Sequence, residues 1–313
     1  MSDITFSTLS SIGCKILLKT DSSRVKSFYA DVGDRSIPDY GFEDLPSPDC
    51  DWELDVFEGD ETSINFGSEE RRTVFHFSER SLWQNDLEFL LVYLFANLYL
   101  AKDLVLSYAV GLRAGNGRGL MLIGGFASGK SATSLKLLQA GAGYLGNDRL
   151  LLGKRQGKMM MLGGSAPIRL RPETIKLHFP EYQSLVDGRS KARFVSVAKE
   201  LRGKQAVPTP INLVARVKVV PVADEFCTCR KLESMEGRFS EIALYPPLSF
   251  FYDHSQLVLL SAGSIYQRLS PESVGDRLLA LSKDISGQSR CVEIFGNLEW
   301  VVSKINSLLE DEK

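Results

Sequence analysis

The chain has 313 residues, of which 44% are hydrophobic and 24% are charged, and its formal net charge is −2. This composition is that of a globular protein and excludes the disordered and fibrous classes. The nearly balanced charge argues against a dedicated nucleic-acid binder, because such domains are strongly basic. The five cysteines do not form an even disulfide framework, and the first residues lack the basic and apolar pattern of a leader. Both features predict a protein of the reducing cytoplasm.

Charge is distributed unevenly along the chain. Residues 31–70 contain fourteen acidic side chains and one basic side chain, whereas residues 154–204 contain twelve basic and four acidic ones. These segments are either solvated surfaces of opposite sign, or the basic one faces phosphates or another anionic substrate.

The first 80 residues predict a small N-terminal α/β domain. Apolar, β-rich segments indicate three strands, and a helix is expected near residues 23–31; the strands cover residues 14–20, 52–59 and 72–78. A helix over about 82–101 follows, with Ser81 and Gln84 spaced as in a capping box. Its apolar run is shorter than the roughly 20 residues that a spanning helix needs, so a buried connecting helix over 81–103 is predicted and no membrane partner is expected.

Residues 104–313 predict one larger domain that begins with a β-hairpin. Two apolar runs flank Asn116-Gly117, a dipeptide that favours a tight turn. The second arm, about 119–124, leads into a glycine-rich loop and then a helix that ends at a glycine. The segment YLGNDRLLL (144–152) alternates and is predicted to form a single strand.

The C-terminal third predicts further alternation of strands and helices. Strands are expected over 211–222, 225–233 and 291–296, and a helix from Ser270-Pro271-Glu272 to about 286. Asn297 is predicted to cap a closing helix, whose core face is formed by Leu298, Val301, Val302, Ile305 and Leu308.

The segment GGFASGKS matches the phosphate-binding pattern G-x-x-x-x-G-K-[ST]. Glycines let the backbone curl so that N–H groups point at phosphate oxygens, and the following helix N-terminus favours an anion. Lys130 is predicted to reach the β and γ phosphates, and Ser131 to coordinate Mg²⁺. The expected ligands are therefore ATP and Mg²⁺; the alternative is a glycine-rich corner with an idle lysine. The expected nucleotide contacts are Gly124, Gly125, Phe126, Ala127, Ser128, Gly129, Lys130, Ser131 and Ala132.

Asp148 lies eighteen residues after Lys130, beyond the predicted helix. If its segment returns to the sheet beside the loop, this carboxylate could bind Mg²⁺ or accept a proton from an attacking hydroxyl. The alternative is a turn aspartate that pairs with Arg149. Asn147, the preceding residue, cannot act as a base and is a weaker metal ligand than a carboxylate, and it is a candidate contact of the substrate.

The hairpin, GGFASGKS, the helix and Y-L-G-N-D together resemble the C-terminal domain of HPr kinase/phosphorylase, a family related in fold to phosphoenolpyruvate carboxykinase. The resemblance implies an α/β P-loop domain with a mixed sheet, and a possible homo-oligomer. It assigns the phosphate cradle to Gly124, Gly129, Lys130 and Ser131. The family's two consecutive aspartates fall on Asn147 and Asp148, which leaves Asp148 as the expected general base.

Two departures from this family change the expected substrate. Leu106, Ser107 and Tyr108 stand where the family has a hairpin histidine, and GGSAPIRLRPET (163–174) replaces its later glycine-rich signature. Within this segment, Arg169 and Arg171 would share one face of a strand. They could bind a phosphate or carboxylate of the substrate, or form surface salt bridges. Glu173 is a further candidate for assisting Mg²⁺.

The sequence therefore predicts an ATP-dependent kinase that transfers the γ-phosphoryl group to a hydroxyl of a peptide, a protein serine or a small metabolite. Two alternatives stay open. One is a nucleotide-binding regulator or scaffold whose acidic N-terminal domain docks a partner. The other is a plain ATPase.

Overall fold

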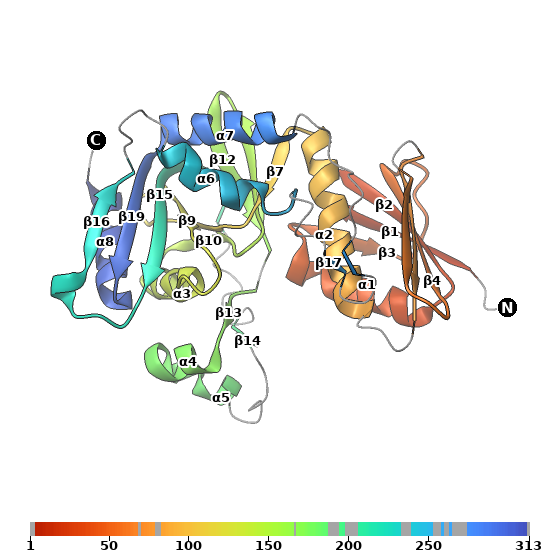
Figure 1. The fold of residues 1–313 in the computed structure, drawn as a ribbon, viewed down its shortest axis with the longest axis horizontal. Helices are drawn as coiled ribbons and strands as arrows, with labels where there is room; N and C mark the ends of the chain where they lie inside the picture. Colours follow the sequence, from red (N-terminus) through yellow and green to blue (C-terminus); the bar gives the residue numbers. More distant parts are fainter. Residues whose placement is uncertain are drawn as a thin grey trace. The chain divides into compact units, whose positions relative to one another are not determined.

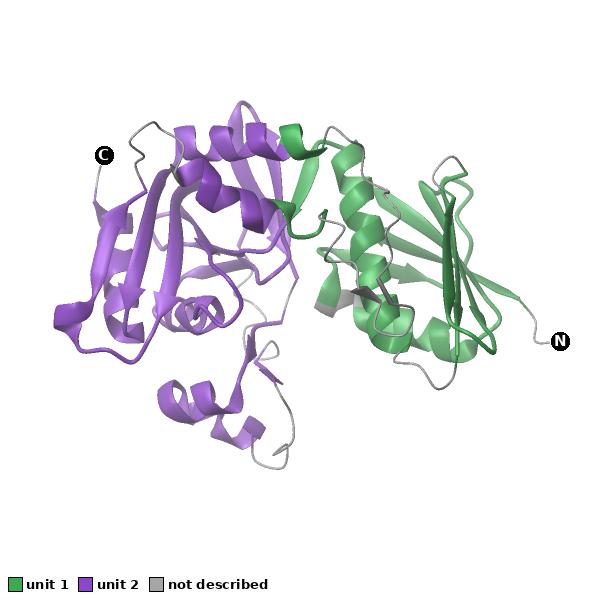
Figure 2. Ribbon diagram, viewed as in Figure 1, with its two compact units in different colours: residues 1–106, 249–277 green, residues 107–248, 278–313 purple. Residues whose placement is uncertain are grey.

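The computed structural model describes residues 4–67, 70–78, 83–165, 167–186, 194–197, 206–232, 239–252, 258–259, 263–264 and 274–311. The chain divides into two compact units, each combining helices and sheet (Figure 2). Unit 1 comprises residues 1–106 and 249–277, and unit 2 comprises 107–248 and 278–313. The fold class is therefore α/β with mixed sheets, as predicted.

Unit 1 is built on a six-stranded sheet of order β3-β1-β2-β4-β6-β5. The three predicted strands are confirmed, whereas β1, β3 and β5 were not predicted. The main elements are β1 (Thr5–Ser11), β2 (Cys14–Thr20), α1 (Ser23–Ser36), β3 (Tyr40–Glu43), β4 (Trp52–Glu58), β5 (Ser63–Gly67), β6 (Arg72–Phe77) and α2 (Trp83–Ala101), with short strands β17 (Val258–Leu259) and β18 (Gly263–Ser264).

Helix α2 confirms the predicted buried helix and belongs to unit 1. Most of its residues between Leu87 and Leu100 are buried, which explains why the apolar run shows little polar alternation. The predicted cap at Ser81 lies outside the described residues. Among the helices that the structure describes, none is long and apolar enough to cross a membrane.

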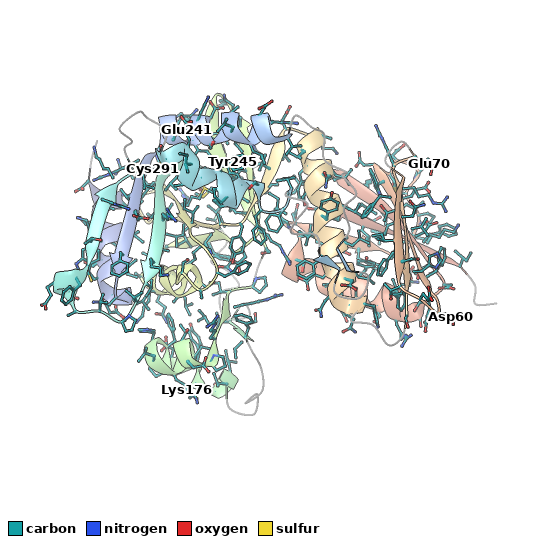
Figure 3. The ribbon with its side chains drawn as sticks, viewed as in Figure 1. Asp60, Glu70, Lys176, Glu241, Tyr245 and Cys291 are labelled. Atoms are coloured by element: carbon teal, nitrogen blue, oxygen red, sulfur yellow. The ribbon has the colours of Figure 1, made fainter. Side chains whose placement is uncertain are left out.

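Part of the acidic stretch is neutralised within unit 1. Ion pairs join Arg24 to Glu58, Lys26 to Asp44, Arg72 to Asp55 and Lys102 to Asp51. Asp60 and Glu70 precede and follow β5, and Figure 3 shows Glu70 near the upper end and Asp60 near the lower end of the unit 1 sheet. The acidic residues of 31–70 therefore do not all gather on one patch.

Unit 2 contains a mixed sheet in which β10, β8, β9, β15, β12 and β11 are neighbours in that order (Figure 1). On the other side of β15, β19 pairs parallel with it, and β16 pairs antiparallel with β19. The strands are β8 (Val110–Arg113), β9 (Gly119–Ile123), β10 (Gly143–Gly146), β11 (Leu150–Arg155), β12 (Lys158–Gly164), β15 (Thr209–Val219), β16 (Thr228–Lys231) and β19 (Arg290–Gly296), and β7 (Leu104–Ser107) leads into this unit.

The predicted hairpin before the glycine loop is confirmed. Strands β8 and β9 pair antiparallel with Arg113 opposite Gly119, and Gly117 has φ +86° in the turn. A left-handed backbone of this kind favours glycine. The helix after the loop is α3 (Lys130–Gln139).

The single strand predicted over 144–152 is wrong. The chain forms β10, turns at residues 147–149, and starts β11 at Leu150. The two halves pair with different neighbours, β10 with β8 and β11 with β12. Asp148 has φ +62°, a left-handed conformation that interrupts the extended backbone.

The C-terminal third largely follows the prediction. Strand β15 confirms the segment at 211–222, and β19 the segment at 291–296. The strand at 225–233 is shorter, because Asp224–Phe226 forms a 3₁₀ turn (η3) before β16. The predicted start at 270–272 lies outside the described residues, and α7 spans Val274–Gln288. Helix α6 (Phe239–Ser249) was not predicted, since Pro246 and Pro247 lie inside it.

Helices α3 and α8 (Leu298–Glu310) pack on one face of this sheet and close its core. Asn297 caps α8 as predicted, because its Oδ1 accepts a hydrogen bond from the Trp300 N–H at 2.9 Å. Four of the five predicted core residues of α8 are buried, and Val302 is partly buried. Smaller elements extend from the sheet: β13 (Arg169–Leu170), α4 (Pro172–His178), η1 (Pro180–Tyr182), α5 (Gln183–Val186) and β14 (Val195–Ser196).

Candidate functional site

Strand directions bring three segments to one edge of the unit 2 sheet. Strand β8 is antiparallel to both β9 and β10, so β9 and β10 run parallel to each other. The glycine loop follows β9, the turn at 147–149 follows β10, and Tyr108 precedes β8. All three segments therefore emerge at the same edge of the sheet. Asp148 thus lies on a segment that returns to the sheet beside the glycine loop, as its predicted role requires.

The loop has a backbone that only glycine accommodates at two positions. Gly129 has φ +95°, and a Cβ there would overlap the side chain of Val219. Gly124 has φ +149°, and a Cβ there would lie 2.5 Å from Ser128 Oγ. The Val219 N–H donates to Ser128 O at 2.8 Å, which ties the loop to β15.

Helix α3 begins directly after Gly129, so its N-terminus forms the end of the loop. The first N–H groups of a helix have no partner within the helix, and the helix dipole is positive at this end. The loop and the start of α3 therefore offer donors suited to phosphate oxygens.

Lys130 is held at the base of the loop by the loop's own backbone. Its Nζ donates to Gly124 O at 2.7 Å and to Gly125 O at 3.2 Å, and it lies 4.2 Å from the centroid of the Tyr108 ring. The residue is only 4% exposed. This burial lowers the pKa of Lys130 to about 8, and the nearby charge of Asp148 opposes that shift.

Asn147 joins the loop to Asp148. Ser131 Oγ donates to Asn147 Oδ1 at 3.3 Å, while Asn147 Nδ2 donates to Asp148 Oδ2 at 3.1 Å and to Pro167 O at 3.2 Å. Asn147 is buried and Asp148 is half-buried. The amide therefore fixes the orientation of the neighbouring carboxylate.

Burial raises the pKa of Asp148 above the ordinary carboxyl value. The charges of Lys130, Arg149 and Arg169 and the hydrogen bond from Asn147 act in the opposite direction. Since the net shift is upward, this carboxylate has a greater affinity for a proton than a solvated aspartate has.

The end of β12 supports this turn, and the sequence analysis did not identify it as part of the site. Ser165 Oγ donates to Asn147 O, Asn147 N–H donates to Ser165 O at 3.1 Å, and Ser165 N–H donates to Arg149 O at 3.1 Å. A Cβ on Gly146 would overlap the backbone of Gly164. The consecutive glycines 163 and 164 before Ser165 were the available signal of this close approach.

The two predicted arginines lie on neighbouring elements. The strand is only Arg169–Leu170, and Arg171 occupies the position before the first turn of α4. Both arginines are exposed and Leu170 between them is buried, so the predicted alternation is present. The positive charge of Arg169 acts to lower the pKa of Asp148. Glu173 lies exposed in the first turn of α4, on which Figure 3 also labels Lys176.

The oxygens of Ser131, Asn147 and Asp148 fit the predicted role in Mg²⁺ binding. Magnesium usually keeps several waters and takes one or two carboxylates together with substrate phosphates. Within the described ranges, no group of three or more His, Cys, Asp or Glu side chains could hold a metal by itself. The chemistry of this donor set therefore suits a metal that arrives with a nucleotide.

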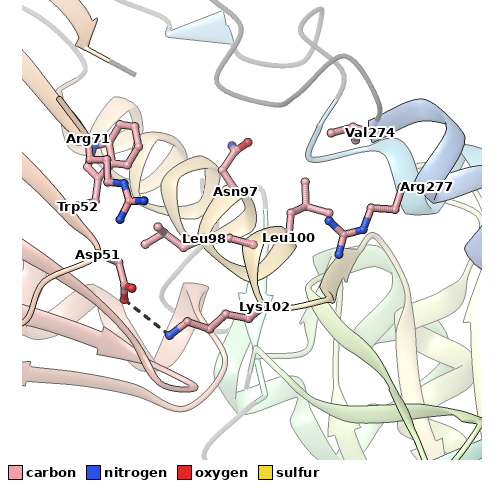
Figure 4. Close-up of a pocket in the computed structure, with 10 residues that line it drawn as sticks. Asp51, Trp52, Arg71, Asn97, Leu98, Leu100, Lys102, Val274 and Arg277 are labelled. Atoms are coloured by element: carbon pink, nitrogen blue, oxygen red, sulfur yellow. Dashed lines mark ion pairs between the residues drawn. The ribbon is translucent and has the colours of Figure 1, made fainter. Parts of the chain in front are cut away.

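Unit 1 contains a separate pocket lined by Asp51, Trp52, Arg71, Asn97, Leu98, Leu100, Ala101, Lys102, Val274 and Arg277 (Figure 4). Two of its cations have acidic partners: Lys102 Nζ lies 3.7 Å from Asp51 Oδ2, and Arg277 forms an ion pair with Asp103. The paired charges and largely apolar lining make this pocket a poorer candidate for phosphate chemistry than the loop of unit 2.

No family model matches this chain, and no curated protein matches it either. Among solved structures, a chain of the HPr(Ser) kinase/phosphatase from Coxiella burnetii is similar to it over 40% of this chain and 70% of that one. The sequence identity is 17% and the TM-score is 0.27. Similarity at this level defines neither fold nor activity, so the function is argued from the geometry of the site.

Proposed function

We propose that this chain is an ATP-dependent kinase that phosphorylates a hydroxyl group. The observation that carries the proposal is the convergence of the glycine loop and the Asn147–Asp148 turn at one sheet edge, with Ser131 Oγ 3.3 Å from Asn147 Oδ1. A phosphate cradle and a candidate base on one edge are the parts that phosphoryl transfer requires, because positioning and charge stabilisation supply most of the catalysis.

In this proposal, the loop backbone and the N-terminus of α3 bind the phosphates of ATP, and Lys130 neutralises the β and γ phosphates. Ser131 and Asp148 would hold Mg²⁺, which supplies charge stabilisation at the phosphates when bound. Arg169, which already influences Asp148, would add positive charge on the substrate side.

Asp148 would act as the general base. As the acceptor oxygen bonds to the γ phosphorus, the bond from that phosphorus to the β–γ bridging oxygen breaks, and ADP leaves. The acceptor proton passes to Asp148. The raised pKa of Asp148 supports this role, because it brings the carboxyl closer to the operating pH.

The acceptor class in this proposal is a peptide hydroxyl, a protein serine or a small alcohol. Neither nucleic acid nor membrane enters the proposal. A cytoplasmic location and a homo-oligomer remain predictions. The resemblance to the HPr kinase family is compatible with the proposal, although Asn147 replaces one of that family's paired aspartates.

The direct test incubates the purified chain with Mg²⁺, ATP labelled in the γ phosphate and a fractionated cell extract. Label entering a peptide, protein or small alcohol is the expected result. Asp148→Asn should abolish transfer while retaining ATP binding. Asp284→Asn is the matched control, because Asp284 is an exposed carboxylate paired with Lys154. Full transfer activity in Asp148→Asn would contradict the assignment of the base.

The alternative is a nucleotide-binding regulator without transfer activity, and Asn147 favours it. In the described site this residue donates to Asp148 and so occupies one of the two carboxylate oxygens. Tight ATP binding with no labelled product and no ADP formed would support this alternative. ADP formed without a labelled acceptor would instead indicate an ATPase.

A further inference from the structure

Tyr108 is a component of the site that the proposed mechanism does not use. Its ring lies over Lys130 with Nζ 4.2 Å from the centroid, which is within the range of a cation–π contact. The ring centroid is also 5.2 Å from that of Phe126, an exposed residue of the loop. Tyr108 therefore touches the loop at both its lysine and its outer rim.

This arrangement leaves Lys130 with little capacity for a ligand. An ammonium group has three N–H donors, and two of them point to Gly124 O and Gly125 O. The ring of Tyr108 covers the group, and the residue is only 4% exposed. A phosphate oxygen can reach Nζ only after one of these neighbours moves.

Displacing the ring disturbs less of the backbone than displacing either loop carbonyl does. The loop is tied to β15 through Ser128 and Val219, and displacing its carbonyls would disturb that link. The backbone of Tyr108 is also anchored, since its N–H donates to Pro247 O at 2.8 Å and Ser107 Oγ donates to the same carbonyl at 3.2 Å. Rotation about the side-chain torsions of Tyr108 breaks neither link.

We propose that Tyr108 is a gate and positioning residue for the loop lysine. Its ring holds Lys130 against the loop carbonyls in the nucleotide-free protein and rotates away when the β and γ phosphates bind. The inference rests on the nucleotide-binding part of the proposed function and does not depend on which acceptor is phosphorylated.

The first test measures ATP and AMP affinity by calorimetry. Tyr108→Ala removes the cover, and ATP should bind about three- to tenfold more tightly, the effect of losing a partly buried cation–π contact. AMP affinity should stay constant, because its single phosphate does not extend to the lysine. Tyr108→Phe keeps the ring, so its ATP affinity should lie closer to that of the wild type than to that of Tyr108→Ala. Tyr108→Leu keeps much of the volume without the ring face, and should resemble Tyr108→Ala.

Tyr245→Ala is the matched control. Tyr245 is partly exposed on α6, the helix that anchors the backbone of Tyr108, and Figure 3 labels it beside Glu241 of the same helix. Loss of this tyrosine should leave ATP affinity unchanged. A change equal to that of Tyr108→Ala would mean that the helix, and not the ring over Lys130, controls binding.

The second test provides a readout that a merely structural role would not move. Tyr108→Ala and Tyr108→Leu should also bind ADP more tightly, because the β phosphate of ADP reaches Lys130, whereas AMP affinity should stay constant. A substitution that only disturbed the fold would weaken the binding of all three nucleotides together.

The possible results distinguish a failure of the gate from a failure of the proposed function. Equal or weaker binding of ATP and ADP by Tyr108→Ala and Tyr108→Leu would overturn the gate and leave the kinase proposal intact. If neither the wild type nor any variant binds ATP, nucleotide binding itself is refuted and the gate with it. Tyr108→Leu provides the same comparison should Tyr108→Ala fail to fold.

Discussion

Replacing Asn147 by aspartate tests the account of the site most severely. Asn147→Asp restores a pair of neighbouring carboxylates, which at first sight improves a metal site. In this structure it has a cost, because Asn147 Nδ2 donates to Asp148 Oδ2 at 3.1 Å and to Pro167 O at 3.2 Å. A carboxylate in this position faces another carboxylate and a buried carbonyl with no proton to donate.

The expected loss in the free energy of unfolding follows from these contacts. Losing the bond to Pro167 O costs about 1 kcal/mol. Two carboxylates about 4 Å apart repel by roughly 4 kcal/mol at an effective dielectric constant near 20. The pair can avoid this repulsion by keeping one proton, but doing so at pH 7 costs a similar free energy. The penalty from the second carboxylate therefore stays near this value. We therefore expect Asn147→Asp to lower the free energy of unfolding by about 3–5 kcal/mol near pH 7 without Mg²⁺.

The pH dependence has a definite sign. Repulsion and burial raise the pKa of the carboxyl pair in the folded state above its unfolded value, so the folded protein binds more protons. The variant should approach wild-type stability near the ordinary carboxyl pKa of about 4 and lose stability as the pH rises above it. Mg²⁺, which binds the folded state, should recover part of the loss.

Urea denaturation over a range of pH, with and without Mg²⁺, provides the measurement. Asn147→Ala removes the same hydrogen bonds without adding charge, and its deficit should change much less with pH. The exchange variant Asn147→Asp with Asp148→Asn keeps one carboxylate and one amide, and should be more stable than the single variant. The reasoning is refuted if Asn147→Asp without Mg²⁺ is as stable as the wild type at neutral pH, or no less stable than Asn147→Ala.

Other substitutions test single features of unit 2. Asp148→Asn should raise stability at neutral pH, since the raised pKa of Asp148 makes its charge unfavourable; in urea denaturation this advantage should vanish near pH 4 and grow above it. Gly146→Ala should cost more than about 2 kcal/mol, because its Cβ overlaps the backbone of Gly164, whereas Gly157→Ala meets no atom within 4 Å and is affected only by its positive φ. Asn297→Ala should cost about 1 kcal/mol through loss of the cap on α8, measured as a lower melting temperature. Gly129→Ala should abolish ATP binding in calorimetry, since both its φ and Val219 exclude a Cβ.

Local features of this protein were determined by the sequence alone. The glycine loop requires residues at fixed spacing, because the backbone at Gly124 and Gly129 cannot carry a side chain. The hairpin turn at Asn116-Gly117 and the cap at Asn297 depend on residues within a few positions of each other. Such features are predictable because their physical causes lie within one short segment.

Features that join distant segments were decided only by the tertiary structure. The segment 144–152 alternates as one strand would, but its two halves pair with β8 and β12, so it breaks at Asp148. The support from Ser165 and the close approach of Gly146 to Gly164 arise because the end of β12 meets the end of β10. No periodicity within one segment contains that information.

The position of Tyr108 over Lys130 has the same origin. In the sequence Tyr108 is twenty-two residues before the lysine and stands out only as a departure from a family pattern. Two antiparallel pairings place the start of β8 beside the ends of β9 and β10, and the carbonyl of Pro247 fixes the backbone there. The motif determined that a phosphate cradle exists, whereas strand pairing decided which side chains surround its lysine.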